Sequence, residues 1–117
     1  MTVNDLKLKL GLNLLSGGKS LENKINGCYI GDLLSMVIGK AKEGNIWITV
    51  MGNVNAVGVA AMVGTSCIVL TEGSHLDDEA KKKAIEHDIA ILSTDLNSYE
   101  LALRIAEVIS YNNRNFL

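Results

Sequence analysis

Apolar positions along the chain fall into blocks that alternate between two spacings. One kind of block is a nearly continuous apolar run, which is typical of a strand buried on both faces of a parallel sheet. The other kind has apolar residues at three- and four-residue spacing, as on one side of a helix. The runs cover residues 46–50, 67–70 and 89–92, and the helical segments that follow them cover residues 54–62, 78–87 and 98–110. This alternation predicts three consecutive βα units.

The first third of the chain carries shorter elements. Thr2 or Asn4 can cap a first helix that contains Leu6, Leu8 and Leu10. Further elements are strands over residues 12–15 and 25–30, separated by a Gly17-Gly18 turn, and a helix over residues 33–42 that stops at Gly44. We therefore expect one three-layer α/β domain with a mainly parallel sheet and flanking helices. Within residues 1–117 we expect an α+β lead-in over 1–31, repeated βα units over 32–110, and a frayed tail over 111–117.

Composition narrows the classes of protein and partner. With 48% hydrophobic residues and 21% charged residues the chain is globular, and no apolar run approaches the roughly 18 residues of a membrane span. Eleven basic and thirteen acidic residues give a net charge of −2, so we expect no nucleic-acid partner. The start of the chain does not resemble a signal peptide, which leads to an expectation of cytoplasmic location.

The cysteines and other potential metal ligands indicate neither a disulfide nor a metal site. Cys28 and Cys67 lie far apart beside β-branched or aromatic residues, which favours reduced thiols in the core over a disulfide framework. No cluster of His, Cys, Asp and Glu has the spacing of metal ligands, so we expect neither a metal nor a cofactor.

Right-handed crossovers place the turns that follow parallel strands at one edge of the sheet, where open α/β proteins bind ligands. We expect a site for a small anionic or nucleotide ligand there, at Asp32, Asn53, Thr71, Gly73, Ser74, His75, Thr94 and Asp95. Some of these residues have a simpler explanation. Asn53 has the position of a helix N-cap, and Asn97 with Glu100 has the spacing of a capping box.

His75 is the one candidate for acid-base chemistry in these turns, with Asp95 or Glu72 to orient it. The turns offer no activated nucleophile beside it, and a solvated or capping histidine is the favoured interpretation. His87 stands at the end of a predicted helix, where a cation complements the helix dipole.

Gly18-Lys19-Ser20 resembles the end of a phosphate-binding P-loop. The glycine expected five residues earlier is Asn13, and Gly27 follows too soon for a phosphate-binding helix. We interpret this segment as a polar turn.

The predicted helix over residues 54–62 has Asn55 as its only polar residue. A helix that is apolar all round is buried, either in its own core or against another chain. We favour a homodimer interface and keep simple burial as the alternative. The interface candidates are Val54, Val57, Gly58, Ala61 and Met62.

Three segments carry a resemblance to a known family: residues 28–35 (CYIGDLLS), 44–50 (GNIWITV) and 92–95 (LSTD). In these segments the chain resembles DRTGG-domain proteins. Members of this family stand alone, form the middle segment of some phosphotransacetylases, lie beside CBS domains in some pyrophosphatases, or are related to the N-terminal domain of HPr kinase/phosphorylase. The resemblance implies a regulatory or ligand-sensing role and a fold similar to the N-terminal domain of Mur ligases.

The chain departs from the two motifs that give this family its name. Asn53-Val54 stands where the Asp-Arg pair is expected, and Thr71-Glu72-Gly73 stands for Thr-Gly-Gly. The Arg charge that could contact an anion is thus missing, and a carboxylate is added.

Three functions follow from the sequence. The first is a non-catalytic regulatory or ligand-sensing domain that acts as a homodimer. The second is an adaptor that binds a larger metabolic enzyme or kinase. The third is a small phosphate-transfer or hydrolytic enzyme that uses His75.

Overall fold

The fold is known from a computed structural model that describes residues 1–113, with side chains described through residue 109. One five-stranded sheet has the order β1-β5-β4-β3-β2, in which β2 to β5 are parallel and β1 is antiparallel to β5. The strands are β1 Asn13–Ser16, β2 Gly27–Ile30, β3 Asn45–Thr49, β4 Cys67–Leu70 and β5 Ile91–Ser93. The predicted mainly parallel sheet is confirmed.

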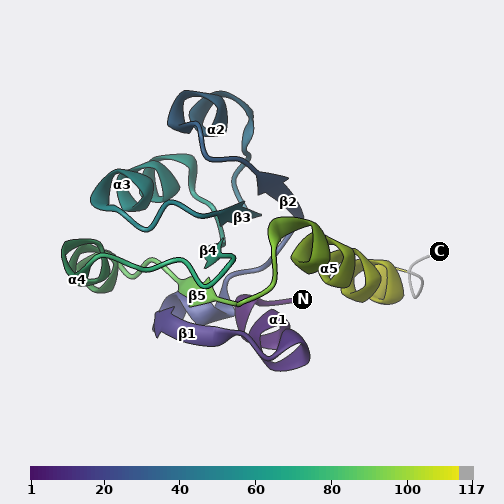
Figure 1. Ribbon diagram of the computed structural model, residues 1–117. Coiled ribbons are helices and arrows are strands. Elements are labelled where there is room, and N and C mark those ends of the chain that lie inside the picture. The colour runs from purple at the N-terminus through teal and green to yellow at the C-terminus, as the bar shows by residue number, and fades with distance from the viewer. Residues whose placement is uncertain (114–117) are drawn as a thin grey trace.

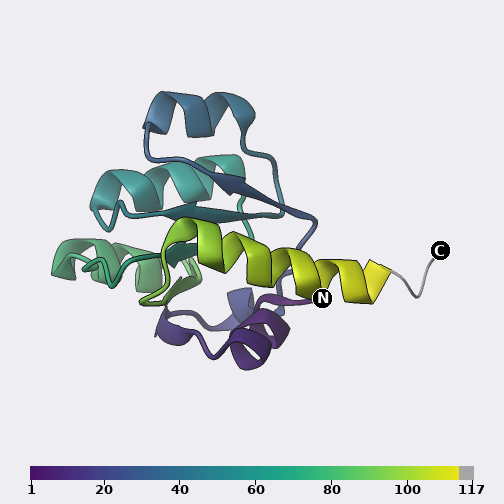
Figure 2. The ribbon, with the colours of Figure 1, turned by 45° about the vertical axis from the view of Figure 1, so that its right-hand side comes forward.

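The helices complete a three-layer α/β domain, as the sequence predicts. They are α1 Val3–Leu10, the 3-10 helix η1 Lys19–Glu22, α2 Leu34–Lys40, α3 Val54–Val63, α4 Asp78–Glu86 and α5 Ser98–Asn113. Because each βαβ crossover moves one strand along in the same direction, α2, α3 and α4 all lie on one face of the sheet. Helices α1 and α5 cover the other face (Figures 1 and 2).

The central strands are apolar along their length because helices cover both of their faces. In β3, Trp47 belongs to the core beneath α2, α3 and α4, while Ile46 and Ile48 belong to the core beneath α1 and α5. All three side chains have 0% exposure. The alternation of side chains along a strand therefore feeds two separate hydrophobic cores.

Local capping explains several helix ends. Thr2 begins α1 with a capping box in which its hydroxyl accepts from the Asp5 N–H and the Asp5 carboxylate accepts from the Thr2 N–H. Helix α2 is shorter than predicted, because Leu33 is its N-cap and Ala41 is extended. Helix α5 runs through Asn113, three residues beyond its predicted end, and residues 114–117 of the predicted tail lie outside the described residues.

The two cysteines differ in environment. Cys67 is 1% exposed on the central strand β4, and burial raises the pKa of its thiol to about 12. Cys28 lies on the edge strand β2 and is exposed, so the prediction of a core position is wrong for this residue. Neighbouring groups still desolvate the Cys28 thiol enough to raise its pKa to about 11. Both thiols are free.

None of the described helices is both long enough and apolar enough to cross a bilayer.

Candidate functional site

The loops that follow β2, β3, β4 and β5 meet at the carboxyl edge of the sheet and form what we call the rim, residues 31–33, 50–53, 71–78 and 94–98. All eight predicted ligand-site residues lie on it. Because neighbouring strands are about 4.8 Å apart, the loop after β2 and the loop after β5 are separated by roughly 14 Å. Asp32 and Asp95 therefore lie at opposite ends of the rim.

Hydrogen bonds between backbone groups join the loops of the rim. The Glu72 N–H donates to the Leu96 carbonyl at 2.8 Å, and the Gly73 N–H donates to the Thr94 carbonyl at 3.0 Å. On the other side of β4, the Asp77 N–H donates to the Gly52 carbonyl at 2.8 Å. The loops after β3, β4 and β5 therefore form one connected structure.

Asp32 fixes the end of β3 from the neighbouring loop. One oxygen of its carboxylate accepts from the Thr49 hydroxyl at 2.7 Å and from the Val50 N–H at 3.1 Å. Its other oxygen has no hydrogen bond to any of the described residues, and the side chain is exposed. Asp32 thus offers an oriented hydrogen-bond acceptor to a ligand at this end of the rim.

Asn53 is the N-cap of α3, and its side-chain oxygen accepts from the Ala56 N–H at 2.9 Å. The predicted capping role is confirmed. The first turn of α3 has no acidic residue, whereas the first turns of α4 and α5 carry Asp78 with Glu79 and Glu100. The first turn of α2, which begins at Leu34, has no acidic residue either, but this helix has only seven residues and its N-cap Leu33 makes no side-chain hydrogen bond. Of the four helix N-termini at the rim, the one at Asn53 is therefore the most favourable for an anion.

Two of the predicted hydroxyls serve the protein itself. Thr71 has 0% exposure, and its hydroxyl shares a 2.9 Å hydrogen bond with the hydroxyl of Ser98. The Thr94 hydroxyl oxygen accepts from the Leu96 N–H at 3.3 Å. These residues hold the loops after β4 and β5 in place.

The turn after β4 has two consecutive residues with positive φ, Glu72 at 59° and Gly73 at 63°. Such angles favour glycine, which explains why a Thr-Gly-Gly sequence suits this turn. An Asp95 carboxylate oxygen would lie 3.1 Å from a Cβ at Gly73, so the absence of a side chain leaves room for this carboxylate.

His75 is exposed, and its imidazole has no hydrogen bond to any residue in the described part of the chain. Neither Asp95 nor Glu72 orients it, whereas the base of a nucleophile–base pair is typically oriented by a third group. The backbone of His75 packs closely on Gly52, and the neighbouring Ser74 N–H donates to the Thr71 carbonyl at 3.0 Å. Ser74 and His75 thus contribute to the packing of the rim through their backbone atoms.

Sequence reasoning missed three residues that shape the rim: Thr49, Gly52 and Ser98. Thr49 and Ser98 are the hydrogen-bond partners of Asp32 and Thr71. Thr and Ser are common at the ends of strands and helices, so the sequence alone does not single out Thr49 and Ser98. Only their hydrogen-bond partners in the structure do. The signal for Gly52 was the glycine itself, one residue before the helix cap.

The helix α3 is buried on one side within its own chain. Val57 is 1% exposed and belongs to the core with Ala56 and Ala60. The burial of Val57 is thus explained by packing within the chain, which the sequence analysis kept as the alternative to a homodimer interface. Among the predicted interface residues, Met62 is 70% exposed. Val54 and Ala61 are also exposed, and Gly58 is half-buried.

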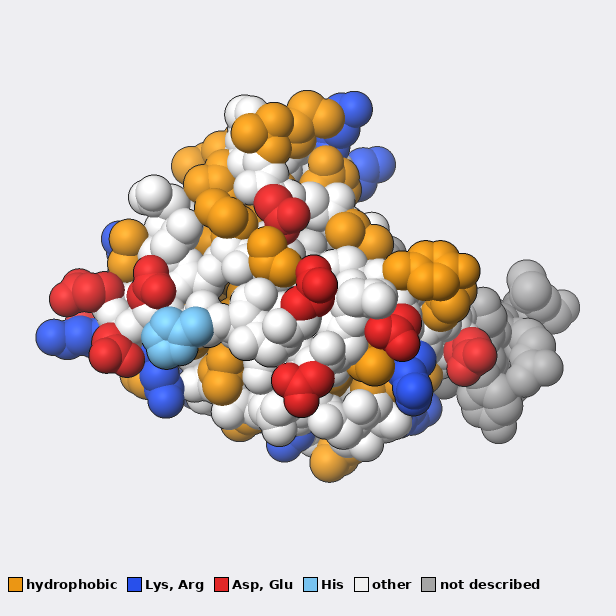
Figure 3. All heavy atoms as spheres, viewed as in Figure 1, with side chains coloured by type: hydrophobic (Ala, Val, Ile, Leu, Met, Phe, Trp, Pro, Cys, Tyr) orange, Lys and Arg blue, Asp and Glu red, His pale blue; other side chains and the backbone are white. Residues whose placement is uncertain are grey.

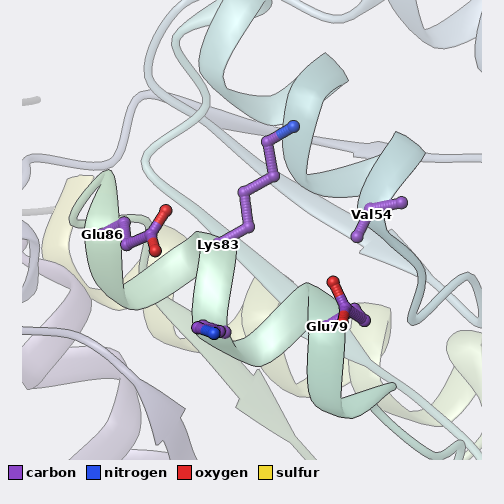
Figure 4. Close-up of a pocket in the computed structure, with 5 residues that line it drawn as sticks. Val54, Glu79, Lys83 and Glu86 are labelled. Carbon is purple, nitrogen blue, oxygen red and sulfur yellow. The ribbon is translucent and has the colours of Figure 1, made fainter.

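Three cavities lined by described residues open away from the predicted ligand residues. The first, of about 460 Å³, lies between α3 and α4 and is lined by Val54, Glu79, Lys82, Lys83 and Glu86. Figure 4 shows Lys83 extending from α4 toward α3, with Glu79 on the side of Val54. The second, of about 290 Å³, opens near Lys24, Glu43 and Thr65, and the third, of about 420 Å³, lies along α5. The first cavity has two acidic and two basic residues, so it has no preference for one sign of charge.

The segment Gly18-Lys19-Ser20 begins a single 3-10 turn: Gly18 is the N-cap of η1, and Lys19 and Ser20 are its first two residues. This helix of four residues is too short to cradle a phosphate. The Ser20 hydroxyl is buried and donates to the Asp88 carboxylate at 3.0 Å. Within residues 1–113 there is no group of three His, Cys, Asp or Glu residues that could hold a metal ion.

The rim carries negative charge. Its loops contain Asp32, Glu72, Asp77, Asp78 and Asp95 and no Lys or Arg. The face drawn in Figure 3 shows a related pattern, with acidic side chains over its middle and Lys and Arg toward its margins. A ligand of the rim must therefore donate hydrogen bonds to carboxylates as well as satisfy a helix N-terminus.

Comparisons with known proteins agree with this fold. The family model described as the DRTGG domain matches residues 5–108. The fold is similar to a crystal structure of the CBS and DRTGG domains of the regulatory region of Clostridium perfringens pyrophosphatase, complexed with the activator diadenosine tetraphosphate. The TM-score is 0.73 at 13% sequence identity, and the match covers 89% of this chain and 45% of that one. The likeness at this identity is one of fold, and the chain spans less than half of the pyrophosphatase region. A search of curated proteins gave no match.

Proposed function

The chain belongs to the DRTGG domain family, and on that premise we propose that it is a non-catalytic regulatory domain that senses a small ligand at the rim and acts as a homodimer. The observation that carries this proposal is the construction of the rim. Its loops are joined by backbone hydrogen bonds, and its one histidine has no orienting partner among the described residues. Such a surface suits binding rather than acid-base chemistry.

The ligand class that suits the rim best is a nucleotide. A phosphate group would accept hydrogen bonds at the N-terminus of α3, beside Asn53, where the first turn has no acidic residue. Ribose hydroxyls would donate to Asp32 at one end of the rim or to Asp95 at the other. Gly73 and Ser74 lie between these positions and complete the binding surface.

Two further observations support a nucleotide. The structural neighbour is complexed with an activator, diadenosine tetraphosphate. A rim of roughly 14 Å accommodates a long ligand with sugar groups at both ends better than it does free phosphate.

The test compares two variants of one residue. Asn53→Asp and Asn53→Ser both keep a good N-cap for α3, but only the first adds a negative charge where the phosphate is expected. Titration calorimetry with diadenosine tetraphosphate, ATP and adenosine should show binding to the unaltered chain and to Asn53→Ser. We expect Asn53→Asp to weaken binding of the two phosphate-containing compounds at least about tenfold, because like charges repel strongly near a protein surface.

Other outcomes would point elsewhere. If none of the three compounds binds, nucleotide sensing is rejected, and co-purification with a larger enzyme would then favour the adaptor hypothesis. If Asn53→Asp and Asn53→Ser bind equally well, the phosphate does not lie at α3.

The homodimer is a separate part of the proposal and is tested by light scattering on the purified chain. The exposed residues of α3, Val54, Ala61 and Met62, are one candidate surface for the second copy. A chain that stays monomeric at every concentration would remove the homodimer and leave ligand sensing in place.

A further inference from the structure

A second candidate site lies at the amino edge of the sheet, the edge opposite the rim, where the parallel strands begin. The loops before β2, β3 and β4 meet there, and residues 23–24, 43–44 and 64–66 line a cavity of about 290 Å³. Ligand pockets in proteins start at about 300 Å³, so a cavity of this size suits a small molecule. None of the predicted ligand residues of the rim lines it.

Hydrogen bonds between the three loops fix the walls of this cavity. The Gly44 N–H donates to the Gly64 carbonyl at 2.9 Å, and the Ser66 hydroxyl donates to the Gly44 carbonyl at 3.0 Å. The Asn23 side-chain amide donates to the Ser66 carbonyl at 3.1 Å. A ligand of this cavity therefore does not have to order the loops that surround it, which favours binding.

Thr65 brings an unpaired polar group to the wall of the cavity. The residue is 9% exposed, and its hydroxyl oxygen is buried without a hydrogen-bond partner in the described part of the chain. Most buried polar groups in proteins have a partner, because an unpaired one costs free energy. The neighbouring Ser66 hydroxyl shows the usual situation, since it bonds to two backbone carbonyls. The Thr65 hydroxyl is thus available to a ligand.

Two side chains of opposite charge line the same cavity. Lys24 comes from the loop before β2 and Glu43 from the loop before β3, and both are exposed. The Cγ atom of Glu43 would lie 3.2 Å from a Cβ at Gly64, so the stem of this side chain lies against the end of α3. The cavity therefore presents one cationic and one anionic group to a ligand.

The end of α3 adds to the negative side of the cavity. Gly64, which is the C-cap of this helix, lines the cavity, and the last turn of α3 has no basic residue. Because its last carbonyl groups lack partners within the helix, the carboxyl end of a helix carries partial negative charge and favours a cation. The part of the cavity near Glu43 and Gly64 therefore suits an ammonium group.

We propose that this cavity binds a small zwitterion of the free amino acid class. The ammonium group of the ligand lies between Glu43 and the end of α3. Its carboxylate lies between Lys24 and the Thr65 hydroxyl, which reaches it by rotation about the Cα–Cβ bond. Glu43 repels a simple anion and Lys24 repels a simple cation, so a ligand that carries both charges is preferred. The site is separate from the rim and depends on neither the nucleotide nor the homodimer.

Matched ligands test the class. Titration calorimetry first measures binding of each standard amino acid to the unaltered chain. The amino acid that binds most tightly is then compared with the same acid without its amino group and with its amide, which has no carboxylate. We expect each of these two compounds to bind at least about tenfold more weakly, because each leaves one charged side chain of the cavity without its partner. If no amino acid binds, or if either compound binds as well as the amino acid, the proposal is overturned.

Matched variants test the place. Glu43→Gln and Lys24→Gln each remove one charge from this cavity, and Glu86→Gln and Lys82→Gln remove the same charges from the cavity beside α4. The first pair should weaken binding of the amino acid at least about tenfold, and the second pair should leave it unchanged. Equal effects of the two pairs, or no effect of either, would show that the amino acid binds elsewhere and would overturn the assignment.

Thr65→Val gives a measurement that a purely structural role would not affect. Valine has a similar shape but no hydroxyl, so the variant should resist urea at least as well as the unaltered chain. It should nevertheless bind the amino acid about fivefold more weakly, because one hydrogen bond to the carboxylate is lost. Unchanged binding by Thr65→Val would overturn the contact with Thr65.

Discussion

Gly52 lies so close to the backbone carbonyl of His75 that a Cβ atom at this position would overlap it. The contact joins the loop after β3 to the loop after β4, next to the hydrogen bond from the Asp77 N–H to the Gly52 carbonyl. Both partners are backbone, so neither can rotate away. Glycine is required here for the close approach of two loops.

Gly52→Ala should therefore destabilise the protein by about 2 kcal/mol or more, because the loops of the rim must move apart to admit the methyl group. Gly58→Ala is the matched control, since a Cβ there meets nothing within 4 Å and the residue lies within α3. That variant should gain about 0.5–1 kcal/mol from helix propensity. Urea unfolding measures both, and equal effects would refute the packing argument.

Glu72→Gly should stabilise the protein by about 1 kcal/mol, because Glu72 has a φ of 59° and a side chain is unfavourable in this region. Asp88 has a similar φ of 52°, but its carboxylate accepts the Ser20 hydroxyl. Asp88→Gly removes that hydrogen bond as well and should gain less. If Glu72→Gly is less stable than the unaltered chain in urea unfolding, backbone strain is not the reason for glycine in this turn.

The free energy of unfolding should fall in alkaline solution because of the buried thiol of Cys67. Burial raises the pKa of its thiol to about 12 in the folded chain, above the ordinary value of 9.0. The folded state holds this proton more tightly, so the stabilisation is complete below pH 9 and is lost as the pH rises toward 12.

The free energy of unfolding should fall by up to about 1.4 kcal/mol for each pH unit of that range from this thiol alone. Cys67→Ala should have the shallower dependence between pH 9 and pH 11, measured by urea unfolding at each pH. Equal slopes for the two proteins would show that another group dominates.

His75→Ala should change the free energy of unfolding by less than about 0.5 kcal/mol, because the imidazole is exposed and has no hydrogen bond to the described residues. The same variant tests the enzymatic alternative. Assays with acyl phosphates and nucleoside triphosphates should give no bell-shaped pH profile. A turnover that is abolished by His75→Ala would favour catalysis over ligand sensing.

The sequence by itself determined which segments form the parallel sheet and in which order their loops follow. Apolar runs such as 67–70 can be buried on both faces only in a sheet covered by helices on each side, and short βα spacing leaves little choice of topology. Caps such as Thr2 and Asn53 were also predictable, because their partners lie three residues away along the chain.

Only the tertiary structure decided which rim residues face outward and which are already paired. The Thr71 hydroxyl is hydrogen-bonded to Ser98, which lies 27 residues later in the sequence. The Thr49 hydroxyl is hydrogen-bonded to Asp32, which lies 17 residues earlier. It also decided that Cys28 lies on an open edge while Cys67 lies in the centre of the sheet, although both have similar neighbours in sequence. Such features depend on which strands and loops become neighbours in space, and local patterns of hydrophobicity and spacing carry no record of that choice.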